Sequence, residues 1–229
     1  MTGAGRALLG LLAGLALAAC AATPPPPATQ KASGRSPAVA FGDDPRPLPR
    51  YHSRRLGLSV PLPDGPTWRI DDHTRPELIA THAPTQSRVM ALVAHADELV
   101  GRAQCEAIAR ARKLVPAGPM QTLEDAVDVT LENYDTRIVV AVEPGAGPGS
   151  PIVGHVMAFG GFLRKCVLFD FSTRVDGASD EAILSSRLAF ARARILGGLK
   201  LDVLGQVARE APVMSEAPLV PPPPAPARP

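Results

Sequence analysis

The chain contains three cysteines, and their surroundings predict different chemistry for them. Cys20 stands where an apolar run ends and a proline-rich run begins, within the stretch LLAGLALAACAATPPPP. A thiol at such a junction is a nucleophile that a transferase could alkylate. Cys105 and Cys166 lie in the middle of the chain, where the chemistry open to a pair of thiols is disulfide formation.

The N-terminal segment has the layout of a secretory signal peptide. Arg6 is the one charge before an uninterrupted apolar run, residues 7–19, and the chain then becomes proline-rich and polar. This run is too short to span a bilayer, because a transmembrane helix needs about 20 apolar residues. We therefore expect residues 1–19 to be a signal peptide that takes no part in the fold.

The residues Leu17, Ala18, Ala19 and Cys20 resemble the lipobox of bacterial lipoproteins. The resemblance implies a protein anchored in the cell envelope through acyl chains, such as palmitate, on Cys20. Ala21 follows where these proteins carry an Asp for retention in the inner membrane, which implies the outer membrane. Two or three chains would anchor the protein permanently, since each buried CH₂ contributes about 0.8 kcal/mol. An ordinary cleavable signal with a chance cysteine is the alternative.

Two proline-rich segments flank the predicted domain, residues 50–204. Residues 20–49 are mostly Pro, Ala, Thr, Ser and Gly, which bury too little apolar surface to offset chain entropy, so we expect a disordered tether. Residues 205–229 contain the run Pro221–Pro224, which favours polyproline II. Aromatic-lined grooves bind such helices, so this disordered tail is a candidate contact for an envelope protein. A tail without a partner is the alternative.

The balance of charge argues against one class of partner. The chain has 24 Lys and Arg against 22 Asp and Glu, a net charge of +2. Nucleic-acid binding is normally marked by a strongly basic surface. We therefore expect no nucleic-acid partner.

Cys105 and Cys166 are predicted to form a disulfide. A lipoprotein folds in an oxidising compartment, and acylation of Cys20 leaves these two as the remaining pair. Two separate buried thiols are the alternative. No His and Asn context marks either cysteine as a catalytic nucleophile.

Other residues with chemical potential lack a convincing arrangement. Asp71–His73 offers oxygen and nitrogen ligands together but is more typical of a solvated strand end. The glycines at 145, 147 and 149 precede a predicted strand, whereas a phosphate-binding loop precedes a helix. We therefore predict no catalytic residue, metal or cofactor. The five histidines lack the short spacings of a readable metal site: His52, His73, His82, His95 and His155.

Residue patterns predict an α+β domain with an antiparallel sheet and two helices packed on one face. Helices are expected at 99–115 and at 179–196, the second with Ser179 as N-cap. The first has a repeating apolar face of Ala103, Ala107, Ile108, Ala111, Leu114 and Val115, and the second has a buried stripe of Leu184, Leu188, Ala191 and Ile195. Gly160-Gly161 is expected to be a hairpin turn. Strands are expected at 56–60, 67–70, 77–81, 88–95, 127–131, 136–142, 152–159 and 162–173.

The element order and the stretch LGLSVPLPDGPTWRI resemble the PsbP-like fold. Its members are largely assembly or adaptor modules, so the resemblance implies a non-enzymatic interaction module. The alternative is a periplasm-facing module that binds an apolar or anionic small molecule, and a third reading is a hydrolase without a recognisable motif. The arginines of the two helices leave open an anion-binding groove between them: Arg102, Arg110, Arg112, Arg187, Arg192 and Arg194.

Overall fold

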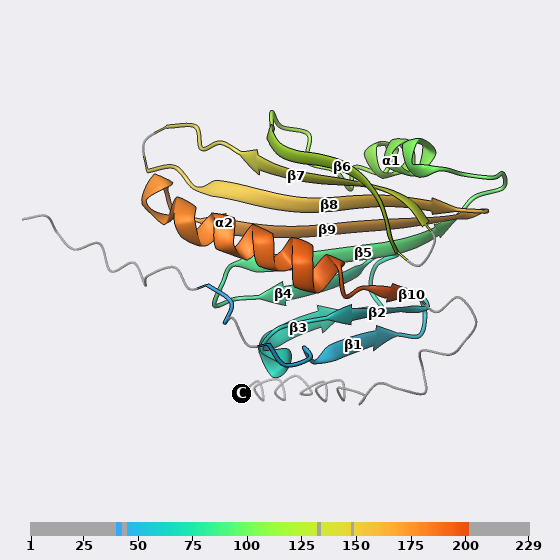
Figure 1. Cartoon of the computed structure of the whole chain (residues 1–229), viewed down its shortest axis with the longest axis horizontal. Coiled ribbons are helices and arrows are strands. Elements are labelled where there is room, and N and C mark those ends of the chain that lie inside the picture. The colour runs from blue at the N-terminus through green and yellow to red at the C-terminus, as the bar shows by residue number, and fades with distance from the viewer. Residues whose placement is uncertain (1–39, 43–44, 132–133, 148, 202–229) are drawn as a thin grey trace, which may run out of the picture. The chain divides into compact units, whose positions relative to one another are not determined.

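The computed structural model describes residues 40–42, 45–131, 134–147 and 149–201, and Figure 1 shows their arrangement. The predicted signal peptide, Cys20, the tether up to residue 39 and the proline-rich tail lie outside the described residues. Within the described part, no helix is long and apolar enough to cross a membrane.

A seven-stranded antiparallel sheet forms the centre of the domain, with the spatial order β3-β4-β5-β9-β8-β7-β6. Its inner strands are rich in Val, Ile, Phe and Ala, which suits strands that are covered on both faces. The predicted α+β class with an antiparallel sheet is confirmed. The strands are β3 (Trp68–Asp71), β4 (Leu78–His82), β5 (Ser87–His95), β6 (Gln121–Leu131), β7 (Tyr134–Glu143), β8 (Ile152–Phe162) and β9 (Lys165–Val175).

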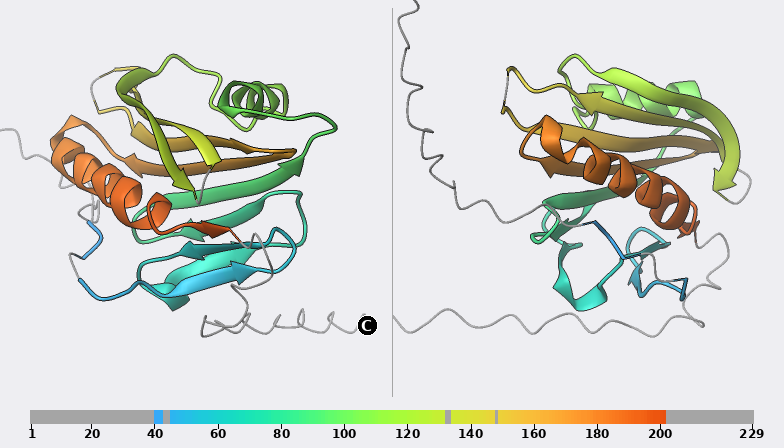
Figure 2. Two further views of the ribbon diagram at one scale, coloured as in Figure 1. Left: turned by 45° about the vertical axis from the view of Figure 1, so that its right-hand side comes forward. Right: turned by 60° about the vertical axis from the view of Figure 1, so that its left-hand side comes forward.

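Two helices, α1 (Arg102–Ala111) and α2 (Glu181–Phe190), lie on opposite faces of this sheet (Figure 2). Successive side chains of a strand point to opposite faces. In β8, Val156 belongs to the apolar cluster that contains the core residues of α2, whereas Met157 belongs to the cluster beneath α1. The prediction of both helices on one face is therefore wrong, because the order of elements does not determine which face a helix covers.

The predicted apolar face of the first helix is correct only in part, since Ile108, Leu114 and Val115 pack against the cluster beneath α1 but its alanines do not. Cys105 and Ala109 are buried, whereas Ala103, Ala107 and Ala111 are exposed. Alanine fits both environments, so its spacing could not identify the buried stripe.

The α2 helix is buried as predicted but begins later. Ser179 lies in a 3₁₀ turn, and α2 starts at Glu181 and continues into the π-helical stretch Ala191–Leu196. The predicted N-cap is therefore wrong. The four predicted core positions are all buried: Leu184, Leu188, Ala191 and Ile195.

The turn between β8 and β9 is displaced from the predicted Gly160-Gly161. β8 continues through both glycines to Phe162, and the two-residue turn is Leu163-Arg164, with φ 53° at Leu163. Glycine at 161 has another role, since a Cβ there would lie 2.7 Å from the Cα of Gly101. This close approach brings the chain before α1 against the sheet.

A second, three-stranded sheet consists of β1 (Arg50–Ser53), β2 (Leu58–Pro61) and β10 (Lys200–Leu201). Its apolar residues join the core on the α2 face of the large sheet. Phe41 is buried in the same core, with its ring centroid 5.1 Å from that of Phe190. Phe41 lies in the range predicted to be a tether, so packed structure begins before residue 50.

Candidate functional site

A hollow of about 740 Å³ opens on the α1 face of the large sheet, beside the C-terminal end of α1. We call it the basic hollow. Strands β5, β8 and β9 provide its floor, and the end of α1 with the following segment provides its wall. It is lined by Arg88, Arg110, Lys113, Leu114, Val115, Pro116, Ala117, His155, Asp170 and Ser172.

The floor is organised by strand register. Ser172 of β9 lies opposite Arg88 of β5 on one side and His155 of β8 on the other. Neighbouring strands are about 4.8 Å apart, so these three side chains form a row across the sheet. Antiparallel pairing thus brings together residues that are far apart in the sequence.

His155 is the most enclosed side chain of this row, with 5% of its surface exposed. Its Nδ1 lies 3.1 Å from Oδ1 of the buried Asp170, and its Nε2 lies 3.6 Å from Oε1 of Glu143. The Nε2 atom has no hydrogen-bond partner within the described part of the chain. A neutral ring that donates from Nδ1 to Asp170 therefore presents Nε2 as an unused acceptor, and a protonated ring presents it as a donor.

The trio of Ser172, His155 and Asp170 has the residue types of a hydrolase triad but not its hydrogen bonds. In a triad, the imidazole bonds to the acid through one nitrogen and to the nucleophilic hydroxyl through the other. Here the second nitrogen has no bond from Ser172 or any other described residue. We therefore assign no nucleophile to these three residues.

The three cations of the hollow have different surroundings. Arg110 donates to Glu106, 2.7 Å away, and so is already paired. Lys113 is exposed just beyond α1. Arg88 is half-buried, and no hydrogen bond or ion pair joins its guanidinium to any of the residues that the structure describes. Arg88 is therefore the cation most available to an anionic ligand.

Ion pairs behind the hollow hold α1 on the sheet. Arg137 of β7 donates to Asp125 of β6 and to Glu106 of α1. Burial acts to raise the pKa of Glu106, but hydrogen bonds from Arg110 and Arg137 outweigh it and lower that pKa. Hydrogen bonds to Asp125 and Glu106 raise the pKa of Arg137. Each charge in this network is thus stabilised by its neighbours, which leaves the position of α1 well defined.

The wall of the hollow is apolar and follows directly from the end of α1. Lys113, at φ 57°, turns the chain, and the amide of Leu114 donates to the carbonyl of Ala109 at 2.9 Å. Leu114 and Val115 then pack against the apolar cluster under α1. The hollow therefore has a polar floor and an apolar wall.

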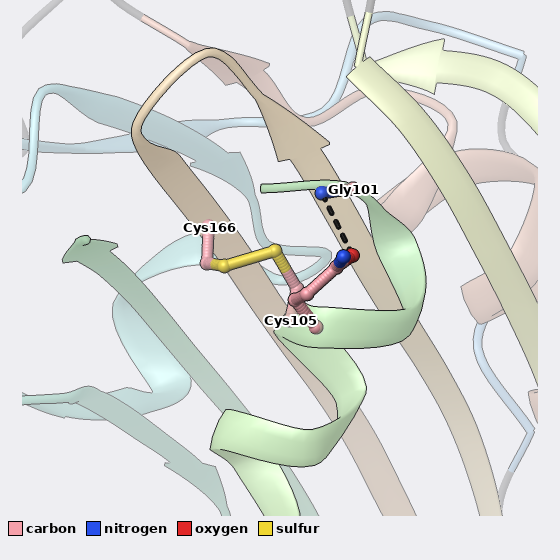
Figure 3. The surroundings of a disulfide bond; sticks show 4 residues. Gly101, Cys105 and Cys166 are labelled. Atoms are coloured by element: carbon pink, nitrogen blue, oxygen red, sulfur yellow. Dashed lines mark hydrogen bonds between the residues drawn. A yellow bond between two sulfur atoms is a disulfide. The ribbon is translucent and has the colours of Figure 1, made fainter. Parts of the chain in front are cut away.

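The disulfide between Cys105 and Cys166 is present, as predicted, with the two Cα atoms 5.4 Å apart. Both residues are fully buried, and the bond joins α1 to β9 (Figure 3). The amide of Gly101 donates to Oε1 of Gln104 in the first turn of the helix, 3.1 Å away. The disulfide therefore fixes the helix that carries the wall of the hollow.

The arginines of the two helices do not share a groove. Because α1 and α2 lie on opposite faces, the proposed anion-binding groove between them does not form. Arg187 is buried, and its Nη1 donates to the carbonyl of Thr85 at 2.8 Å. Arg102 contacts Asp135 and Arg192 contacts Glu124. This sequence-based hypothesis is therefore wrong.

The Asp71–His73 run does not form a joint ligand set. Asp71 accepts hydrogen bonds from the hydroxyl and amide of Thr74 and the amide of His73, which lower its pKa to about 2. The buried Asp72 accepts hydrogen bonds from Arg55, Ser53 and Tyr51 instead. Among the described residues, no group of three or more His, Cys, Asp or Glu side chains could hold a metal ion. The glycine-containing loop leads from β7 into β8 rather than into a helix.

No family model matches this chain, and no curated protein matches it. A solved structure from Bacteroides thetaiotaomicron VPI-5482 is similar over 70% of this chain and 51% of its own, with 9% identity and a TM-score of 0.43. The chain thus spans about half the length of that protein. The Ran-binding protein Mog1p of Saccharomyces cerevisiae is similar over 67% of this chain and 94% of its own, with 7% identity and a TM-score of 0.47. We draw no functional argument from either likeness.

Proposed function

We propose that this protein is a bacterial envelope lipoprotein whose folded domain is a non-enzymatic interaction module. Acyl chains on Cys20 would anchor it, most simply in the outer membrane because Ala21 follows the cysteine. The proline-rich tail would then be available to an envelope protein partner.

The proposal rests on one observation, namely that two of the three cysteines are joined in a disulfide and the third lies in the lipobox-like sequence. Cys105 and Cys166 are joined in a buried disulfide, which is typical of proteins that fold in an oxidising compartment. Of the three cysteines in the chain, this bond leaves Cys20, the residue in the lipobox-like sequence. The disulfide and the N-terminal pattern therefore support the same route of export and anchoring.

Mass spectrometry of the N-terminal peptide, combined with crosslinking in intact cells, tests the proposal. We expect an acylated Cys20 in the native protein and recovery of the Cys20→Ser variant from the soluble fraction. A reproducible crosslinked envelope partner should be lost when residues 217–229 are deleted. An unmodified Cys20 in the membrane-associated protein would overturn the anchoring proposal.

The basic hollow supports a second candidate function, the binding of an anionic small molecule on the periplasmic side. Its floor combines a buried imidazole with the half-buried Arg88, which has no bonded partner among the described residues. Native mass spectrometry of gently purified protein tests this function directly. A retained small anion would favour it over a purely protein-binding role.

A further inference from the structure

We propose that the basic hollow binds a small organic monocarboxylate, with its carboxylate over Ser172 beside Arg88 and its hydrocarbon part against the Leu114–Ala117 wall. The inference rests on the second candidate function above and specifies its ligand. It draws on the charge, register and shape of one site.

Arg88 provides the main argument for an acid ligand. Its guanidinium is half-buried and has no bonded partner among the described residues. A charge that is partly removed from water is costly unless it is paired. The planar guanidinium matches a carboxylate through two parallel N–H···O bonds. A bound carboxylate would therefore give Arg88 the direct ion pair that no described residue provides.

The row across the floor places further polar groups beside that carboxylate. Ser172 lies between Arg88 and His155, one strand from each. A carboxylate over Ser172 would thus be about one strand spacing, ~4.8 Å, from either neighbour. The Ser172 hydroxyl can donate to it. His155 borders the position through its ring, whose Nδ1 side faces Asp170 and whose Nε2 side faces Glu143 of β7.

The other charges favour a single negative charge on the ligand. Arg110 is already paired with Glu106, and Lys113 is exposed at the rim. Asp170 lies in the lining, and Glu143 is 3.6 Å from His155. These two carboxylates would repel a dianionic phosphate more strongly than a monocarboxylate.

The size and wall of the hollow favour a ligand with a short hydrocarbon part. Its volume of about 740 Å³ lies within the roughly 300–1,000 Å³ typical of small-molecule sites. The wall contributes Leu114, Val115, Pro116 and Ala117 in succession. A carboxylate with an alkyl chain would use the polar floor and the apolar wall together.

Isothermal titration of octanoate into the full chain carrying Cys20→Ser tests the inference without detergent. We expect saturable one-to-one binding and a tenfold to hundredfold loss, roughly the effect of one charge-assisted interaction, in Arg88→Gln. The matched control is Arg112→Gln, which changes an exposed arginine outside the lining and should leave the affinity unchanged. Equal affinities for the parent and Arg88→Gln, or the absence of saturable binding, would overturn the proposal.

A second variant keeps the test informative if Arg88→Gln does not fold. Ala117 is exposed at the wall, so Ala117→Trp should block the hollow while leaving the melting temperature close to that of the parent. Retained binding in this variant would overturn the assigned location. Octanol and octyl phosphate should bind at least tenfold more weakly than octanoate, and equal or tighter binding of either would overturn the assigned ligand class. Acylation of Cys20 and capture of a partner are measured separately, so failure of octanoate binding leaves the anchoring proposal intact.

Discussion

The two faces of the large sheet are stabilised in different ways. On the α2 face, the helix, the small sheet and Phe41 bury one extensive apolar core. On the α1 face, a smaller apolar cluster is supplemented by a disulfide, and part of the sheet remains open as the basic hollow. The difference suggests that a covalent link compensates for limited apolar packing where part of the sheet is left uncovered.

Two arginines illustrate the same contrast. Arg187, on the α2 face, has 1% of its surface exposed, and its Nη1 donates to the carbonyls of Thr85 and Arg174 and the hydroxyl of Thr173. Arg88 is more exposed and has no such bonds to the described residues. We therefore interpret Arg187 as structural and Arg88 as available for a ligand.

The largest expected effect comes from truncating the core on the α2 face. Phe169 and Leu168 are adjacent in β9, both 1% exposed, and point to opposite faces. We expect Phe169→Ala to lower the free energy of unfolding by about 3–5 kcal/mol and Leu168→Ala by about 2–3 kcal/mol. Urea denaturation of both variants measures this difference. A greater loss for Leu168→Ala would contradict the proposed division between the faces.

Removal of the disulfide should have the next largest effect and should act mainly on the α1 face. The bond joins cysteines 61 residues apart, and we expect the double substitution Cys105→Ala and Cys166→Ala to cost about 2–4 kcal/mol. Hydrogen exchange should accelerate in α1 more than in α2, because α2 retains its apolar core. Equal acceleration in both helices would show that the disulfide stabilises the whole domain uniformly.

A smaller loss is expected where the chain before α1 contacts β8. A Cβ at Gly161 would lie 2.7 Å from the Cα of Gly101, and backbone cannot move aside as a flexible side chain can. We expect Gly161→Ala to lower the free energy of unfolding by about 1–3 kcal/mol. Gly118→Ala is the control, since no atom lies within 4 Å of a Cβ there, and chemical denaturation of both variants provides the measurement. Equal stabilities would contradict the close approach.

The sequence predicted the elements better than their positions around the sheet. Alternating residues identified most strands, and Leu184 and Leu188 identified the buried side of α2 because leucine has a clear preference for the core. The alanines of α1 carry no such preference, so Ala103, Ala107 and Ala111 were predicted on the buried side although they are exposed. The residue pattern of a helix does not indicate which face of the sheet the helix covers, because that depends on the path of the connecting loops.

The residues of the candidate site were harder to predict from the sequence than the positions of the helices. Arg88, His155 and Ser172 are separated by many residues and meet only through the pairing of β5, β9 and β8. A usable signal was present, namely a polar residue inside each otherwise apolar strand, as in VGHVMAF and LFDFS. Strand pairing places these residues in one row across the sheet. To predict that row, one must know which strands are neighbours in space, and the sequence pattern does not reveal this.

The smallest and most local effect should be a pH dependence from His82 on the α2 face. Burial lowers the pKa of this imidazole below 6.5, and although Asp64 acts to raise it, Arg187 lowers it further. Below pH 6.5 the unfolded chain therefore binds a proton that the folded chain resists. The associated stability is present above that pH and is lost as the pH falls from 6.5 toward the lower pKa of the folded state.

Denaturation of the parent and of His82→Asn between pH 5 and pH 8 measures this contribution. The amide of Asn can still bond with the hydroxyl of Thr85, which lies 2.7 Å from Nδ1 of His82, but it does not titrate. We expect the stability of His82→Asn to decline less steeply below pH 6.5 than that of the parent, and His95→Asn, at an exposed position, to follow the parent. If His82→Asn and the parent declined in parallel, proton uptake by the α2 core would not cause the loss, and the titrating groups would have to be sought on the more open α1 face.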